Sequence, residues 1–193
     1  YGSLMQTIAG LHYNFSFSDE FFNILLSLEE NKNEKELKNE VYLHIARNFK
    51  RFGWLYFFLY GASPAVCDSF VEKGKHGLES LPGGGLYKPN STSLRMGDLG
   101  YISKAQDNLN ISYNTLEDYC LDLENALTTP YKAYQDIGEF VDDKRVQLNT
   151  SVIQIENEYY STIRPKRVCP SGKKPIEVLR AEGINYLELR CVD

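Results

Sequence analysis

Cysteine and long apolar runs are scarce in this sequence of 193 residues. The four cysteines, at positions 67, 120, 169 and 191, lie far apart, and no C-x-x-C pair occurs. This spacing excludes the common zinc-ligand and thioredoxin-like motifs, and we expect reduced thiols in the cytoplasm. No apolar run is long enough to cross a bilayer and no secretory signal pattern is present, so we expect no membrane partner.

Positive charge is in deficit as well. The chain has 21 Lys and Arg residues against 26 Asp and Glu residues, a formal net charge of −5, which argues against a nucleic-acid partner. The glycines at 83–85 are not followed by the Gly-Lys-Ser/Thr signature of a phosphate loop, and we interpret residues 72–89 as a surface excursion. The remaining composition, 42% hydrophobic and 24% charged, is typical of an ordinary globular domain.

Aromatic residues are plentiful, and several alternate with polar residues in the segment 5–17, as in a β-strand. One face would carry Leu11, Tyr13, Phe15 and Phe17, and the other Gln6, Ile8, Gly10, His12 and Asn14. The first face predicts an aromatic wall against a core. The second is either the solvent side of a half-buried strand or a ligand site, where Gly10 leaves room for the ligand.

Helical spacing and capping residues predict several helices. They are expected over residues 19–28, capped by Ser18 with Phe21, Leu25 and Leu28 inside, and over residues 34–60, 114–126 and 175–181. The segment 34–60 is expected to be one long helix, with Gly53 as a position of close packing or a kink. Its part 54–58 is apolar all round and is therefore expected to be buried.

Two more strands are expected, and together with the helices they indicate an α+β fold. One covers residues 146–160 and would place Gln154, Glu156, Glu158 and Tyr160 on one face. The other covers residues 184–193, with Tyr186, Glu188 and Arg190 on one face and Leu187 and Leu189 on the opposite face. Between them lie Arg164, Lys166 and Arg167, in what is either a solvated turn or a contact for nucleotide phosphates or a carboxylate.

A polar loop at residues 91–101 contains Arg95, Asp98 and Tyr101 between glycines. Arginine can clamp a carboxylate with two parallel hydrogen bonds. A local pair between Arg95 and Asp98 is the alternative, because close opposite charges often satisfy each other.

Five stretches resemble the proteobacterial glutamate–cysteine ligase family: residues 1–16, 61–67, 91–101, 154–168 and 184–193. The resemblance implies a glutamine-synthetase-like α+β fold, a mostly antiparallel sheet flanked by helices that is incomplete here. It makes residues 1–193 a single partial domain, the central part of the catalytic domain. The family's enzyme is longer, and its upstream acidic segment, which supplies much of the metal site, has no counterpart here. We therefore expect both ends to be cuts and the isolated chain to be inactive.

The resemblance also implies the reaction and its residues. A member of this family would form γ-glutamylcysteine from L-glutamate, L-cysteine and ATP through a γ-glutamyl phosphate, with Mg²⁺, or Mn²⁺ in its place. Position by position, it assigns the metal to His12 and Glu188, the migrating phosphoryl group to Arg190, the nucleotide to Arg164, and the amino-acid substrates to Gln6, Asn14, Arg95, Tyr101 and Tyr160.

Two other functions stay open at this stage. One is a non-catalytic amino-acid-binding module that uses Arg95 and the polar face of the first strand. The other is a different glutamine-synthetase-like ligase, whose acceptor amine is not cysteine. For the ligase we expect small-molecule partners only, a cytoplasmic location and a monomeric parent.

Overall fold

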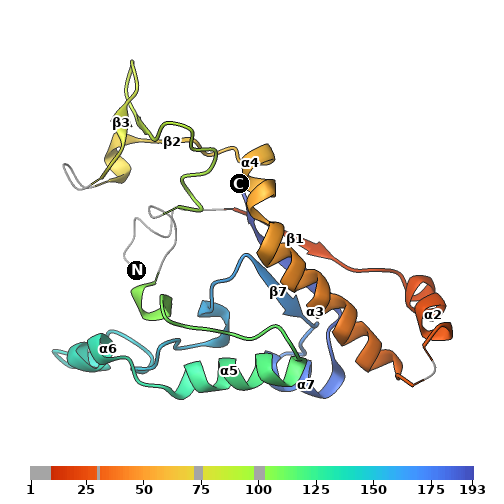
Figure 1. The fold of residues 1–193 in the computed structure, drawn as a ribbon. Coiled ribbons are helices and arrows are strands. Elements are labelled where there is room, and N and C mark those ends of the chain that lie inside the picture. Colours follow the sequence, from red (N-terminus) through yellow and green to blue (C-terminus); the bar gives the residue numbers. More distant parts are fainter. Residues whose placement is uncertain (1–9, 30, 72–75, 98–102) are drawn as a thin grey trace.

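The computed structural model describes residues 10–29, 31–71, 76–97 and 103–193. Its centre is an antiparallel sheet in the order β1 (Leu11–Phe15), β8 (Tyr186–Val192), β7 (Ile163–Lys166) (Figure 1). The strand near the end of the chain therefore lies between the first strand and β7, and it pairs with both. This arrangement confirms the α+β class with antiparallel pairing.

Two smaller antiparallel sheets lie outside this centre. One has the order β2 (Ala65–Val66), β4 (Leu86–Tyr87), β3 (Glu79–Ser80), and the other pairs β5 (Phe140–Val141) with β6 (Lys144–Arg145). The glycines at 83–85 all have positive φ angles and form the turn between β3 and β4, a conformation that suits glycine. The predicted surface excursion thus contains a short hairpin.

The helices follow the capping signals in the sequence. They are α2 (Asp19–Ser27), α3 (Glu34–Phe52), α4 (Trp54–Tyr60), α5 (Leu116–Thr128), α6 (Lys132–Ile137) and α7 (Pro175–Glu182), with short 3₁₀ turns at Asp68–Phe70, Lys104–Gln106 and Glu156–Glu158. Ser18 caps α2 as predicted, by accepting a hydrogen bond from the Phe21 amide. No helix in the described ranges is long and apolar enough to cross a membrane.

The prediction of one helix from 34 to 60 is wrong, because α3 ends at Phe52 and α4 begins at Trp54. Gly53 lies between them, and its carbonyl accepts from the amides of Tyr56 and Phe57, which starts the new helix. The expected burial of residues 54–58 is also wrong, since Trp54 is 63% exposed. Figure 1 shows the reason: α3 crosses the sheet, whereas α4 lies beyond the end of α3.

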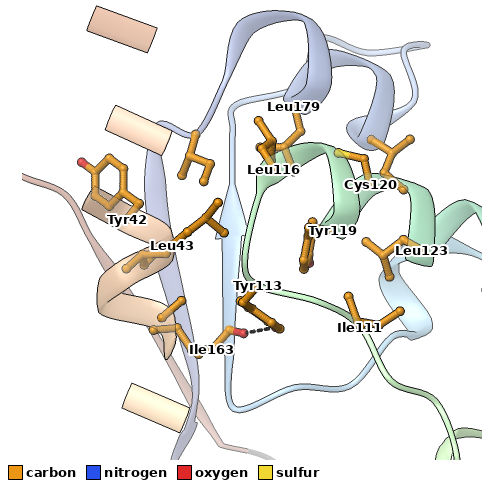
Figure 2. Close-up of a cluster of buried hydrophobic side chains, with 14 of the residues drawn as sticks. Tyr42, Leu43, Ile111, Tyr113, Leu116, Tyr119, Cys120, Leu123, Ile163 and Leu179 are labelled. Atoms are coloured by element: carbon orange, nitrogen blue, oxygen red, sulfur yellow. Dashed lines mark hydrogen bonds between the residues drawn. The ribbon is translucent and has the colours of Figure 1, made fainter. Parts of the chain in front are cut away.

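The core gathers side chains from both helical layers around the sheet. Figure 2 shows Leu43 of α3 and Tyr119 and Leu123 of α5 converging on the region of Ile163 in β7. Tyr113 donates from its hydroxyl to the Ile163 carbonyl at 2.8 Å, so this buried polar group is satisfied. The core fixes β7 and β8 from the side opposite to Glu188 and Arg190, because Leu187 and Cys191 are fully buried.

The faces of β1 and α2 that were predicted to be buried are only partly buried. Leu11 and Tyr13 are 65% and 60% exposed, because β1 is an edge strand and α3 packs against β7 and β8. Phe17 does pack against the core. In α2 the buried residue is Phe22, whereas Leu28 is 74% exposed. The aromatic wall is therefore confined to the end of β1 and the start of α2.

The predicted strand at 146–160 is wrong. The backbone there is satisfied partly by local side chains, since Gln154 accepts from the Leu148 amide at 2.8 Å, and partly by the segment after α5, since the Val152 amide donates to the Thr129 carbonyl at 2.9 Å. Such local bonds compete with sheet formation. The following cationic segment, for which a solvated turn was one of two alternatives, forms β7, and Pro165 is tolerated because β7 is an edge strand.

Helices α5 and α7 are joined by an ion pair whose loss should lower stability. Arg180 donates two hydrogen bonds to Glu124, at 2.6 and 2.8 Å, and one to Glu117 at 3.2 Å. These side chains are partly exposed, so we expect Arg180→Met to lower the free energy of unfolding by about 1 kcal/mol. Arg145→Met, which removes one exposed pair with Glu139 and a contact with the Phe140 ring, should have a smaller effect.

The pH dependence of the Arg180 effect has a definite sign. Hydrogen bonding to Arg180 lowers the pKa of Glu124 in the folded protein. The contribution of the pair is therefore fully present above the pKa of Glu124 in the unfolded chain, and it is lost as the pH falls through the folded pKa. Urea unfolding at about pH 7 and about pH 3 checks this, since the difference between Arg180→Met and the unmodified protein should shrink at the lower pH. A difference that stays constant would contradict this account.

Candidate active site

Glu188 lies at the centre of the sheet, in the middle of β8. It is directly opposite Asn14 of β1 on one side and Arg164 of β7 on the other. Residues that face each other in antiparallel strands project to the same side of the sheet. The register therefore brings three predicted site residues, from the beginning and the end of the chain, into one row.

The carboxylate of Glu188 is surrounded by cationic and imidazole groups. Its Oε1 is 3.5 Å from Nδ1 of His12, and its Oε2 is 3.9 Å from both Nζ of Lys166 and Nε of Arg190. The Glu188 side chain is 16% exposed and that of His12 is 44% exposed, so the group is reached from outside on the β1 side. Burial lowers the pKa of Lys166, and the nearby Arg164 acts in the same direction. One carboxylate here faces several positive charges.

Arg190 is held in place by the segment before β7. Its Nη1 donates to the Tyr159 carbonyl at 3.2 Å, and its guanidinium lies over the ring of Tyr160, 5.8 Å from the ring centre. Burial raises the pKa of Tyr160, so its hydroxyl stays protonated at neutral pH. That hydroxyl donates to Sδ of Met96 at 3.4 Å, which connects this group to the loop that carries Arg95.

Arg95 lies at the end of β8 that follows Arg190. Its Nη2 donates to the Arg190 carbonyl at 3.0 Å, and its Nη1 donates to the Val192 carbonyl at 3.3 Å. Asp193 anchors the same loop by accepting from the Ser93 hydroxyl at 2.9 Å. The loop and β8 are therefore one connected unit.

The predicted gap at Gly10 is filled by Arg95, not left open for a ligand. A Cβ atom at Gly10 would overlap the terminal atoms of the Arg95 guanidinium and lie 2.7 Å from its Nε. The absence of a side chain at Gly10 permits this close approach of Arg95. The Nε of Arg95 is buried and has no hydrogen-bond partner among the described residues.

Arg164 lies deeper than the other site residues. It is 5% exposed, and its two terminal nitrogens donate to the carbonyls of Tyr159 at 3.3 Å and Glu156 at 3.2 Å. Its guanidinium also lies over the Tyr159 ring. Its role toward a nucleotide stays a prediction, and in this structure it holds the segment before β7 against the sheet.

Two predicted site residues, Gln6 and Tyr101, lie outside the described residues, as does Asp98, the alternative partner of Arg95. The described predicted residues gather at β8, whereas two cavities of about 580 and 360 Å³ elsewhere are lined by none of them. Lys166 was not among the assigned site residues. It shares a face with Arg164 by the two-residue spacing of a strand, a signal that was not used because no strand was predicted at residues 163–166.

Comparisons with known proteins agree over the whole chain. The glutamate-cysteine ligase family model matches residues 1–193. The chain is 46% identical over 194 residues to a glutamate–cysteine ligase of Janthinobacterium sp. (strain Marseille) and 47% identical over 194 residues to one of Pseudomonas putida (strain KT2440). It is also similar to the crystal structure of a glutamate–cysteine ligase from Francisella tularensis in complex with AMP, with a TM-score of 0.88 and 36% identity.

These matches cover all of this chain but only part of each relative. The chain spans 37% of the length of both curated relatives and 38% of the Francisella chain. The activity of a complete relative can therefore be tested only on the full-length protein that contains this chain.

Proposed function

Because this chain belongs to the glutamate–cysteine ligase family, we propose that its full-length protein joins L-glutamate to L-cysteine with ATP as the co-substrate. The product is γ-glutamylcysteine, and the reaction is the first step of glutathione synthesis. The observation that supports this most directly is the environment of Glu188, whose carboxylate lies within 4 Å of an imidazole and two cationic side chains, His12, Lys166 and Arg190. That arrangement suits a metal–polyphosphate group.

The proposed reaction has two steps. A γ-carboxylate oxygen of glutamate attacks the γ-phosphorus of ATP, the bond from that phosphorus to the β–γ bridging oxygen breaks, and ADP leaves. The amine of cysteine then attacks the acyl carbon of γ-glutamyl phosphate, a C–N bond forms, the acyl–oxygen bond breaks, and phosphate leaves while the amine loses a proton. Catalysis of such transfers depends on positioning and electrostatic stabilisation.

Mg²⁺ is the cofactor that we propose, with Mn²⁺ as its alternative. Glu188 offers the carboxylate oxygen that Mg²⁺ prefers, and His12, a less usual ligand, is 3.5 Å away, so both can reach one ion. Among the described residues no three His, Cys, Asp or Glu side chains gather, so this pair fits as one part of a ligand set. When bound, the ion would neutralise negative charge on the phosphates.

Arg190 is proposed as the catalytic residue for phosphoryl transfer. It lies two residues from Glu188 on the same strand face, and its contacts with Tyr159 and Tyr160 fix its direction. A guanidinium held in this way can stabilise the charge that develops on the migrating phosphoryl group without having to reorganise.

The amino-acid substrates are proposed to contact the residues around this centre, namely Gln6, Asn14, Arg95, Tyr101 and Tyr160. Arg95 is proposed to hold a substrate carboxylate. Its guanidinium carries five N–H donors, and its bonds to the β8 carbonyls leave others available, Nε–H among them. Arg164 is proposed to act on the nucleotide through its charge, from its buried position beside Glu188.

We further propose that residues 1–193 form the central part of one catalytic domain in a cytoplasmic, monomeric parent protein. The match to 37% of a longer relative supports its being part of a larger protein. Its proposed partners are glutamate, cysteine and ATP, and the net charge of −5 argues against a nucleic-acid partner.

The test is ADP release by the purified full-length protein. We expect release to require glutamate, cysteine and Mg²⁺ together, with γ-glutamylcysteine formed in equal amount. Release that is as fast with other small amines as with cysteine would indicate a different amine–carboxylate ligase. Tight glutamate binding in calorimetry, without any ADP release, would indicate a binding module and overturn the proposal.

A further inference from the structure

The three cationic side chains at 164, 166 and 167 have separate environments in the structure. They are adjacent in sequence, and all of them could meet a phosphate or a carboxylate. The hydrogen bonds of these three side chains show which head groups are already bound to other groups of the protein.

Arg164 and Arg167 are engaged by the protein itself. Arg164 is buried and donates to two backbone carbonyls. Arg167 donates from Nε to the Glu182 carboxylate at 2.7 Å and from Nη1 to the carbonyls of Glu182 and Gly183 at 2.9 and 3.1 Å. These carbonyls are at the end of α7, where a cation is favourable. Both arginines therefore have structural roles here.

Lys166 differs from both. Its side chain is 22% exposed, and its ammonium group makes no hydrogen bond with the described residues. The nearest opposite charge is Oε2 of Glu188, at 3.9 Å. The backbone of Lys166 is fixed, since its carbonyl accepts from the Asn185 amide at 2.9 Å. A fixed strand thus presents a head group that can still move along its flexible stem.

The charge balance of this sheet face indicates an anionic ligand. Lys166 and Arg190 are both 3.9 Å from the same carboxylate oxygen, and Arg164 is opposite Glu188 on the ladder. Glu188 cannot neutralise all of them. If Glu188 turns to a divalent cation, the charge of Lys166 is left for another acceptor.

We propose that Lys166 binds a phosphate of the nucleoside triphosphate, and that it moves from Glu188 to this phosphate when Glu188 takes up the divalent cation. Lys166 is then the direct contact of this strand with the nucleotide, and the buried Arg164 supports it from behind. The proposal rests on the proposed function, because it assumes that ATP and Mg²⁺ meet at Glu188.

The experiment measures nucleotide binding without turnover. The full-length protein is titrated with a non-hydrolysable ATP analogue and Mg²⁺ in a calorimeter, and Lys166→Met is compared with Lys166→Arg and with Lys132→Met. Lys132 is 81% exposed and pairs only with Asp136, so it is a matched control. We expect Lys166→Met to weaken binding about 10- to 100-fold, the loss expected for one hydrogen bond to a charged group. Lys166→Arg should recover part of this loss, and Lys132→Met should bind normally.

A second measurement separates this role from a structural one. Mn²⁺ binding without nucleotide, followed by electron paramagnetic resonance, should become tighter in Lys166→Met, because Glu188 loses a competing cation. A merely structural role would weaken the binding of both ligands and lower the melting temperature. Unchanged nucleotide affinity in Lys166→Met, with normal binding by the unmodified protein, would overturn the role of Lys166 alone. Failure of the unmodified protein to bind the nucleotide would overturn the proposed function as well.

Discussion

Replacing Glu188 by glutamine is expected to lower the rate of ADP release by the full-length protein by about 10²- to 10³-fold, the size of effect seen when one preorganised electrostatic group is removed. Glutamine has nearly the same shape but no charge, so the change removes the proposed metal ligand and the counter-charge of Lys166 and Arg190. The strand itself should persist, because its burial comes from Leu187 and Cys191 on the opposite face.

The measurement is the ADP release rate as a function of Mg²⁺ concentration, with circular dichroism to check the fold. Higher Mg²⁺ should recover part of the activity if Glu188 contributes to metal affinity. Glu177→Gln is the control, since this carboxylate is 57% exposed on α7 and pairs only with Lys174. If Glu188→Gln retained near-normal activity, Glu188 would be removed from the metal site.

Much of the central sheet could be predicted because its pattern is local. In β8, alternation separates Glu188 and Arg190 from the buried Leu187, and α7 before it ends at Gly183 as the sequence indicates. Alternation failed at 146–160, because it does not reveal whether a partner strand exists. There local side chains and the segment after α5 satisfy the backbone, and β7 is the strand that pairs with β8 instead.

The candidate site could be predicted only in part, for a related reason. Strand alternation placed Glu188 and Arg190 on one face, but it could not show that Asn14 is directly opposite Glu188, since register across distant segments is a tertiary property. The same holds for Gly10, where the sequence indicates a close approach but does not identify Arg95 as the group that approaches. Long-range packing therefore determines which polar residues lie together, and the sequence pattern alone does not predict it.

Substitution of Arg190 is expected to have the second large effect on the reaction. A conservative substitution there can separate the contribution of its hydrogen-bond geometry from that of its charge. Its guanidinium donates to the Tyr159 carbonyl, lies over the Tyr160 ring, and has its Nε 3.9 Å from Glu188. Lysine keeps the positive charge but lacks the planar fork that fixes these contacts and can donate two parallel hydrogen bonds to a phosphoryl group. Arg190→Lys therefore tests positioning and not charge alone.

We expect Arg190→Lys in the full-length protein to lower kcat by about 10²-fold or more, with little change in the KM for cysteine, because the contact it loses is the one we propose for the transition state of phosphoryl transfer. Steady-state kinetics, together with the melting temperature, checks this. Arg145→Lys, at an exposed arginine that pairs with Glu139, should leave both unchanged. If Arg190→Lys lowered the melting temperature strongly and raised every KM alike, Arg190 would be a support for the segment before β7. If its kcat were normal, phosphoryl stabilisation would have to come from another cation of this face, and Lys166, whose ammonium makes no hydrogen bond with the described residues, would be the first to examine.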